Sequence, residues 1–314
     1  MRTLGRVAVT VRFVGGGVAM GEAGTAIWLL TDRAYLRQRM PRALLDWLRA
    51  HDRATLVVAD GAGLITELAQ SGESAATSAW EGLEAGDLVV ARSRHPFALA
   101  LLRQAETLGA RSCDSWSMVQ KVRDKFSCTL ALVKRGLPVP TTFVAERPAD
   151  FRRLPSRCFP LLLKPVLGNN ARGIYLVRHP GELRPIRWRG GLVLAQSYVD
   201  SNGVDVKLYA AGTAVWAVRR PSPLAPQGTP PVREPVTPAL HDIVEACRDE
   251  FQLQLLGVDV LDSEIGPMIV DVNEFPNYTG IEEAPAVIGR LVLDEARAGR
   301  SRAPVRSALP AVRA

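Results

Sequence analysis

Short apolar strands alternate with amphipathic helices in the first third of the chain, and this alternation restricts the fold more than any other feature. Residues 25–31 (TAIWLLT), 54–60 (ATLVVAD) and 87–93 (DLVVARS) have the pattern of buried strands. Residues 41–51 (PRALLDWLRAH) have helical periodicity with proline in the first turn, and another helix follows the third strand. Alternation at this length predicts a small parallel sheet with helices on its faces, which is an α/β architecture.

The pattern changes near residues 113–118. The stretch MVQKVRDKFSCTLALVKRG predicts one helix, or two joined, that ends at Gly136. Further along, a helix is expected over 237–251 and a final one near 283–297, with strands between and before them. This second region is therefore α+β and rich in antiparallel strands, and a ligand cleft between lobes is expected.

One segment of the second region is dense in proline. Residues 221–236 contain six prolines, which remove backbone donors, so we expect a long loop without regular structure. Loops of this length inside a compact domain tend to be lids or binding loops.

The net charge of +7 raises the question of nucleic-acid binding. Aromatic residues that could stack on bases are sparse, and five arginines with no acid follow Glu295, so much of the excess charge is a feature of the terminus. Nucleic acid is therefore not expected as a partner. No apolar run is long enough for a membrane helix, and no secretion signal is expected at the N-terminus.

The four cysteines lie far apart without CxxC spacing, as free thiols of a reducing compartment would, so a cytoplasmic location is expected. Lysine is the scarcer base by far. Only five of the 39 basic residues are lysine, namely Lys121, Lys125, Lys134, Lys164 and Lys207. Where arginine serves most positions, the remaining lysines are candidates for sites that need a compact ammonium among phosphate oxygens, although chance survival is the simpler explanation for Lys121 and Lys134.

The segment GVDVLDSEIGPMIVDVN predicts a hairpin that carries oxygen ligands. If its strands pair about the turn Ser263 to Gly266, Asp259 and Asp271 come near each other, and Asn273 leaves the same face as Asp271. Two carboxylates and an amide oxygen form a hard oxygen site suited to magnesium with a nucleotide. The alternative is that these side chains simply face solvent.

The strand PLLLKP and the turn after it form a second candidate element. Lys164 interrupts a buried apolar run, where an ammonium is costly unless it is paired. The turn from Gly168 to Gly173 (GNNARG) has amides that could close over phosphates.

Several such motifs occur in a defined order along the chain. They are Asp124-Lys125, GLPVPTT (136–142), LLLKP, the glycine turn, LAQSYV (194–199), VDVKLYAAG, AVRRP (217–221), GVDVL and VDVNEFPNYTGIE (270–282). This order resembles the ATP-grasp superfamily, in its RimK-type amino-acid ligase group, over roughly residues 85–295.

The resemblance implies ATP with magnesium, as two ions or with manganese in its place. Lys125 and Lys164 would contact nucleotide phosphates, and Asp259, Asp271 and Asn273 would hold the metal, with Asp271 at a position where glutamate is more usual. The remaining nucleotide contacts would come from Gly168, Asn169, Asn170 and Gly173 of the turn, and from Gln196, Ser197, Tyr198, Val199 and Asp200 of the hinge and its end.

The resemblance also implies the catalytic groups. Lys207, where arginine is more usual, would reach the γ-phosphate or an acyl phosphate, and Arg220 would do the same or bind an acidic substrate. Glu274 would either add a carboxylate near the metal or face solvent.

The implied fold is an ATP-grasp fold. Its parts would be an N-terminal strand extension (1–20), a small parallel α/β domain (21–115), a first ATP-grasp lobe (116–190), a second lobe (191–297) and a disordered basic tail (298–314).

The implied function is ATP-dependent ligation of a carboxylate to an amine, often that of an amino acid, through an acyl phosphate. Because 221–236 replaces the family's usual stretch after the paired arginines, the substrates stay open. The strings RRPSP and NEFPNYTG also resemble the inositol-phosphate kinase branch, so a kinase acting on an anionic hydroxyl compound is the alternative. A third reading is a protein that binds ATP without turnover. The oligomeric state is left open, with a homodimer among the alternatives.

Overall fold

The computed structural model describes residues 11–12, 26–51, 56–60, 80, 83–168, 173–189, 191–201, 203–222 and 230–301. The chain divides into two compact units. One comprises Met1–Cys113 together with Ile288–Ala314, and the other comprises Asp114–Val287. Among the described residues, no helix is long and apolar enough to cross a membrane.

The first unit has a five-stranded sheet in the order β1-β3-β2-β4-β5. The strands β2 (Ile27–Thr31), β3 (Leu56–Asp60), β4 (Leu88–Arg92) and β5 (Arg111–Ser112) are parallel, and β1 (Val11–Arg12) is antiparallel to β3. The predicted parallel sheet is confirmed. Of the predicted extension over residues 1–20, only Val11–Arg12 is described, and it adds the edge strand β1.

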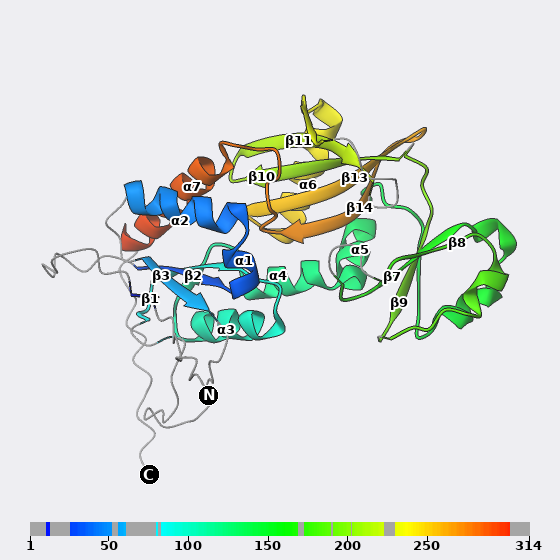
Figure 1. The fold of residues 1–314 in the computed structure, drawn as a ribbon, viewed down its shortest axis with the longest axis horizontal. Coiled ribbons are helices and arrows are strands. Elements are labelled where there is room, and N and C mark those ends of the chain that lie inside the picture. The colour runs from blue at the N-terminus through cyan, green and yellow to red at the C-terminus, as the bar shows by residue number, and fades with distance from the viewer. Residues whose placement is uncertain are drawn as a thin grey trace, which may run out of the picture. The chain divides into compact units, whose positions relative to one another are not determined.

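Helices α1 (Arg33–Leu36), α2 (Arg39–His51) and α3 (Pro96–Thr107) follow the strands, and α2 and α3 lie on opposite faces of the sheet (Figure 1). The last helix, α7 (Ala284–Ser301), packs on α2 through Gly289. A Cβ at Gly289 would lie 2.0 Å from Cε3 of Trp47, so only glycine leaves room for this ring. Because α7 runs to Ser301, the tail predicted from residue 298 is helical at its start, and residues 302–314 lie outside the described part.

The second unit begins with two helices, α4 (Trp116–Arg123) and α5 (Lys125–Lys134). Asp124 separates them, since it closes α4 and its carboxylate accepts a hydrogen bond from Ser127 N at 2.7 Å to start α5. The left-handed Gly136 (φ +71°) follows α5, as predicted. Of the two alternatives that the sequence left open, one helix or two joined, the structure has two joined helices.

Two antiparallel sheets form the rest of the second unit. The four-stranded sheet has the order β6-β9-β7-β8, with β6 (Thr142–Ala145), β7 (Leu161–Pro165), β8 (Tyr175–Val177) and β9 (Val193–Ser197). The predicted boundary at 190/191 places β9 in the second lobe. In the structure β9 pairs with β6 and β7, so it belongs to the four-stranded sheet.

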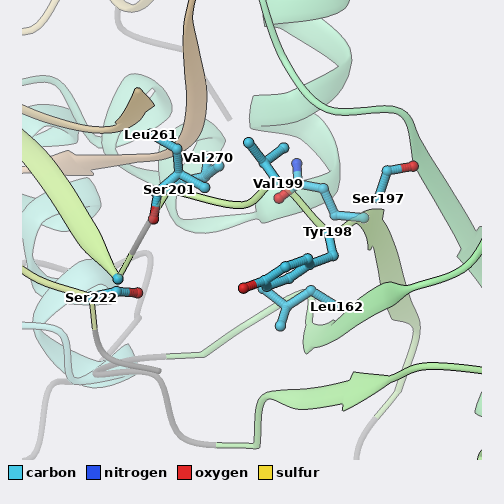
Figure 2. Close-up of a pocket in the computed structure, with 10 residues that line it drawn as sticks. Leu162, Ser197, Tyr198, Val199, Ser201, Ser222, Leu261 and Val270 are labelled. Carbon is cyan, nitrogen blue, oxygen red and sulfur yellow. The ribbon is translucent and has the colours of Figure 1, made fainter. Parts of the chain in front are cut away.

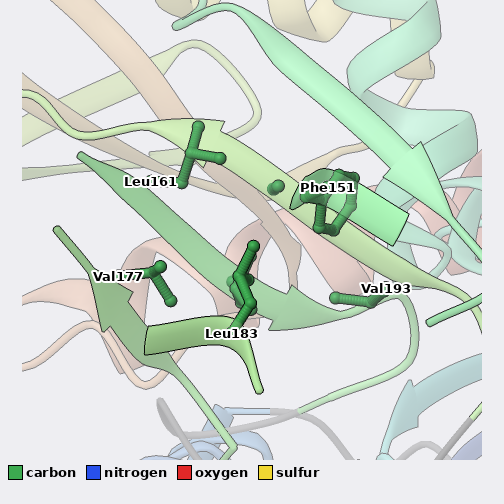
Figure 3. Packing of buried hydrophobic residues seen from close by; sticks show 7 residues of the cluster. Phe151, Leu161, Val177, Leu183 and Val193 are labelled. Carbon is green, nitrogen blue, oxygen red and sulfur yellow. The ribbon is translucent and has the colours of Figure 1, made fainter. Parts of the chain in front are cut away.

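One face of the four-stranded sheet is covered by the 3₁₀ turns η1 (Pro148–Arg153) and η3 (Pro180–Leu183). A third short turn, η2 (Ser156–Cys158), follows η1 along the chain. Phe151 and Leu183 of these turns pack on Leu161, Val177 and Val193 of the sheet (Figure 3). Side chains alternate between the faces of a strand. The neighbouring residues of β7 and β9 therefore point to the opposite face.

The five-stranded sheet has the order β12-β11-β10-β13-β14. Its strands are β10 (Val204–Ala211), β11 (Ala214–Pro221), β12 (Val232–Glu234), β13 (Leu255–Ser263) and β14 (Gly266–Glu274), and α6 (Pro238–Phe251) precedes β13. The expectation of a loop without regular structure over 221–236 is wrong at β12, which pairs with β11. Residues 232–234 contain no proline, so their backbone donors are available for the ladder, whereas residues 223–229 lie outside the described part.

Candidate nucleotide and metal site

A β-bulge in the β13–β14 hairpin brings the predicted carboxylates together. From Ser263–Gly266 to Val260–Ile269 the strands pair regularly, and the register then shifts so that Asp259 opposes Asp271. Without the shift, Asp259 would oppose Val270, and Asp271 would point to the other face. The bulge therefore places both carboxylates on one face, and Asn273 follows on that face opposite Gly257.

Asp259 and Asp271 each form ion pairs, and they do so with different cations. Lys207 Nζ of β10 lies 2.6 Å from Asp259 Oδ1, and Arg220 of β11 lies 3.2 Å from the same oxygen. Lys125 Nζ, at the start of α5, lies 2.5 Å from Asp271 Oδ1. The two predicted catalytic cations thus share one carboxylate, and the first predicted phosphate lysine contacts the other.

The electrostatics follow from this pairing. Burial alone would raise the pKa of Asp271, but the ammonium groups of Lys125 and Lys164 outweigh it and lower the pKa to about 2. Burial lowers the pKa of Lys207, and the neighbouring Asp259 opposes that change. Asp271 is therefore ionised at neutral pH, as a metal ligand must be.

Lys164 is held by two neutral acceptors. Its Nζ donates to Gln196 Oε1 and to the backbone oxygen of Val270, both at 2.9 Å. Val270 is the residue that the bulge leaves out of the ladder, so the bulge that aligns the carboxylates also presents this acceptor. Burial is the main reason that the pKa of Lys164 falls to about 8. An ammonium has three donors, so one remains for a ligand.

The orientation of Gln196 is fixed by a residue on the neighbouring strand. The hydroxyl of Thr142 donates to the backbone oxygen of Pro140 at 2.8 Å, and it accepts from Gln196 Nε2 at 3.2 Å. Because the single hydroxyl proton of Thr142 is already used, the amide nitrogen of Gln196 faces Thr142 and its oxygen faces Lys164. Thr142 lies in the GLPVPTT motif, to which the sequence assigned no role.

A pocket opens beside Lys164, between the two sheets of the second unit (Figure 2). Its walls are Leu162 and the hinge on one side, and Leu261 and Val270 of the hairpin on the other (Figure 2). All of the predicted hinge residues except Asp200 line it, and the full set is Leu162, Gln196, Ser197, Tyr198, Val199, Ser201, Gly203, Ser222, Leu261 and Val270. Asp200 is exposed and is not part of this wall.

Asp205 is a carboxylate at this site that the sequence reasoning missed. It is only 6% exposed, it is bonded to Ser222 of the pocket wall, and burial raises its pKa. Among the residues that the structure describes, its buried Oδ1 has no hydrogen-bond partner. A signal was present, because Asp205 precedes Lys207 by two residues in an apolar strand and so shares its face.

Glycines shape two parts of the site. A Cβ at Gly257 would lie 3.0 Å from Pro276 Cβ and 3.5 Å from Lys207 Cε, so the absence of a side chain leaves room for Lys207 to cross to Asp259. A Cβ at Gly168 would lie 2.7 Å from Pro165 Cγ, and Gly173 has φ +74°, so both ends of the predicted phosphate turn require glycine. Asn169 and Asn170 between them lie outside the described residues.

Glu274 is buried, which contradicts the solvent-facing alternative considered for it. Its side chain is buried and pairs with Arg123 at 2.9 Å. Glu274 therefore does not face solvent, and its charge is already balanced by Arg123.

The donor set fits magnesium with a polyphosphate. Two carboxylates and one amide offer hard oxygen atoms, and among the described residues no group of three or more His, Cys, Asp and Glu side chains could hold a metal alone. Such a partial set suits an ion that completes its coordination with phosphate oxygens and water. The lysines around it suit the phosphates, and the pocket suits a flat apolar ring.

Comparison with known proteins agrees with this geometry. The family model for the RimK-like ATP-grasp domain matches residues 122–288. A probable alpha-L-glutamate ligase of Legionella pneumophila (strain Corby) is 27% identical over 202 residues, which cover 60% of this chain and 67% of the relative. The ribosomal protein bS6–L-glutamate ligase of Salmonella newport (strain SL254) is 29% identical over 213 residues, which cover 62% and 71%.

Solved structures show the same fold. A RimK domain protein from Sphaerobacter thermophilus superimposes with a TM-score of 0.66 at 18% identity, covering 86% of this chain and 99% of the other. D-cycloserine synthetase DcsG gives 0.64 at 19% identity, with the same coverage of 86% and 99%. The fold is the predicted ATP-grasp fold, and the chain belongs to the family of RimK-like ATP-grasp domain proteins.

Proposed function

We propose that the chain is an ATP-dependent ligase that joins a carboxylate to an amine through an acyl phosphate. The observation that carries the proposal is the bulged hairpin, which puts Asp259 and Asp271 on one face beside Lys207 and Lys125. The relatives named as glutamate ligases support the reaction class.

The residues of this chain would bind and orient the nucleotide. The adenine would lie in the pocket lined by Leu162 and Tyr198, and the unused donor of Lys164 would contact the nucleotide. The Oδ1 of Asp205, which has no partner among the described residues, would accept from a ribose hydroxyl, whereas the sequence resemblance placed a nucleotide contact at Asp200. Gly168 and Gly173 would let their turn close over the phosphates.

Magnesium would be held by Asp259, Asp271 and Asn273, and it would supply charge neutralisation at the phosphates. Lys207 and Arg220 would then turn from Asp259 toward the γ-phosphoryl group, because a bound cation would balance the negative charge of that carboxylate in their place. Both cations stabilise the negative charge that develops on the transferred group.

The proposed reaction has two displacements. A carboxylate oxygen of the substrate attacks the γ-phosphorus, and the bond to the ADP oxygen breaks. The amine nitrogen then attacks the acyl carbon, phosphate leaves with the carbon–oxygen bond electrons, and the nitrogen loses a proton. No side-chain nucleophile is needed, and burial raises the pKa of the Cys247 thiol to about 12 and also raises that of Cys128.

A kinase acting on an anionic hydroxyl compound was the alternative. Arg219 and Arg233 could bind such an anion, but each is already paired with an acid of this chain. Arg219 pairs with Glu234 at 2.7 Å, and Arg233 pairs with Glu283 at 2.7 Å. These two arginines are thus paired within the chain, which favours ligation.

The deciding experiment measures ADP release over panels of carboxylic acids with and without amines. Ligation requires both partners and yields an amide detectable by mass spectrometry. A phosphoester product formed without any amine would establish the kinase instead, and ATP binding without ADP release for any acceptor would leave a binding protein.

A further inference from the structure

The surface of the turns that cover the four-stranded sheet is strongly basic. These turns comprise residues 147–159 and 178–189, which we call the arginine cap. The cap contains eight arginines and two acids, so its formal net charge is +6. All eight arginines are exposed, namely Arg147, Arg152, Arg153, Arg157, Arg178, Arg184, Arg187 and Arg189.

The charge of the cap is a local feature. Residues 296–314 contain five arginines and no acid, and the chain outside this terminus and the cap has a net charge of −4. If arginine were simply frequent throughout the chain, the residues outside the terminus and the cap would not carry a net negative charge. The prediction that assigned much of the excess charge to the terminus was therefore incomplete.

The two segments of the cap form one layer. Turns η1 and η3 pack against each other, and Phe151 and Leu183 enter the same apolar cluster (Figure 3). Leu154, Ile186 and Trp188 pack against that cluster, and the arginines between these anchors point outward. A folded frame therefore presents the arginines on one surface.

Most of these arginines lack an ionic partner in the described part of the chain. The acid Asp150 pairs with Arg147 at 3.5 Å, and Glu182 accepts from Arg178 N at 2.7 Å. Seven arginines of the cap form no ion pair with any described residue, namely Arg152, Arg153, Arg157, Arg178, Arg184, Arg187 and Arg189. Such a surface repels itself and is stabilised by an external polyanion.

The cap lies on the face of the sheet away from the nucleotide pocket. Leu161 and Leu163 enter the cluster beneath the cap, whereas Leu162 and Gln196 line the pocket on the other face. A partner on the cap would therefore leave the nucleotide site open. The cap suits docking rather than chemistry.

We propose that the arginine cap docks an acidic stretch of a polypeptide. Arginine forms bidentate pairs with carboxylates, and arginine with tryptophan and tyrosine is the composition of protein interfaces. The aromatic pair beside the cap fits this reading, since Trp188 packs into the core and bonds to Gly191 O at 3.0 Å, with the Tyr175 ring 6.2 Å away. A surface for single-stranded nucleic acid would instead present several aromatic rings on which bases could stack.

The test compares two charge-reversal variants of the whole chain by fluorescence anisotropy. One carries R184E, R187E and R189E in the cap. The control carries R37E, R39E and R42E, which reverse three exposed arginines of the other unit and change the net charge equally. The probes are a labelled oligoglutamate peptide, an oligoglutamine peptide of the same length, and a single-stranded oligonucleotide of equal charge.

We expect oligoglutamate to bind the parent chain at low ionic strength, and oligoglutamine not to bind. The cap variant should bind oligoglutamate about tenfold more weakly, because several surface ion pairs are lost together, while the control variant keeps the parent affinity. Added salt should weaken binding to the parent. Thermal unfolding shows whether each variant is folded, and R184Q, R187Q and R189Q together replace the cap variant if it is not.

Two results would overturn the proposal. The first is no binding of oligoglutamate, or an equal loss in the cap and control variants. The second is tighter, cap-dependent binding of the oligonucleotide, which would make the cap a nucleic-acid surface. Neither result bears on ligation, because the assay measures binding without turnover.

Discussion

Asp259 and Asp271 lie on the same face of their hairpin because the ladder shifts by one residue at Val270. A regular hairpin around the turn Ser263–Gly266 would have separated them onto opposite faces. The residue left unpaired by the shift also offers its backbone oxygen to Lys164. One irregularity in β14 thus arranges both the proposed metal ligands and the lysine that we propose contacts the nucleotide.

Replacing Asp271 by asparagine should abolish most turnover. The amide removes the charge that holds Lys125 and the proposed metal, and we expect kcat to fall about a hundredfold or more. Asp271→Glu is the matched control, since it keeps the carboxylate with one more methylene and should retain much of the activity. Steady-state ADP release measures both. Equal activity of Asp271→Asn and the parent would refute a metal role for this residue.

Thr142→Val should weaken ATP binding more than it slows the reaction. Valine keeps the shape of threonine but cannot accept from Gln196, so the amide loses its fixed orientation and Lys164 loses a reliable acceptor. We expect KM for ATP to rise about tenfold, as for one lost hydrogen bond to a charged network. Thr142→Ser keeps the hydroxyl and should restore the parent KM. If serine and valine behave alike, the hydroxyl is not what positions Lys164.

Gly257→Ala should lower kcat by displacing Lys207. The added methyl would press on Pro276 and meet the Lys207 stem, and overpacking of this kind costs about 1–3 kcal/mol. Gly191→Ala is a control, because a Cβ there meets nothing within 4 Å. Both variants are compared by kcat and by urea unfolding. A Gly257→Ala enzyme with parental kcat would show that Lys207 need not cross this position.

Asp114 should make the stability of the second unit depend on pH. Burial raises the pKa of its carboxyl to about 7, although the backbone N–H groups of Gln254 and Leu255 oppose the increase. The folded state therefore holds the proton more tightly than the unfolded state. The contribution of Asp114 to the free energy of unfolding is complete below about pH 4 and is lost as the pH rises through about 7.

Asp114→Asn mimics the protonated form and does not titrate. In urea unfolding between pH 5 and pH 8, the parent should lose stability relative to this variant, at about 1.4 kcal/mol per pKa unit of difference. The exposed Asp242→Asn is the control and should follow the parent. Parallel stability curves for the parent and Asp114→Asn would contradict the assignment.

The sequence predicted elements better than it predicted irregularities. Apolar periodicity located the strands and helices, because burial sets that period, and the hairpin carrying Asp259 followed from its turn. No feature of the local sequence predicts the register shift at Val270, because valine is common in regular strands. The assignment of β9 to its sheet depends on pairing between residues far apart in the sequence, and the periodicity of apolar residues does not predict such pairing.

Contacts between distant residues were equally hidden. The order of donors from Gln196 through Thr142 to Pro140 arises only when β6 and β9 pair. Asp205 was overlooked in favour of Asp200, although its position two residues before Lys207 gave its face. The charge of the cap was visible in the sequence, but its collection on one surface required the packing of η1 on η3.

The contact between Trp47 and Gly289 gives the first unit a spectroscopic marker. The indole packs where helix α7 has no side chain, and it also stacks on the His51 ring, with the two ring centroids 4.0 Å apart. The chain has six tryptophans, of which Trp28, Trp47 and Trp80 belong to this unit and Trp116, Trp188 and Trp216 to the other. Emission from a chain that keeps only Trp47 would therefore follow the undocking of α7 from α2, separately from events at the pocket of the second unit.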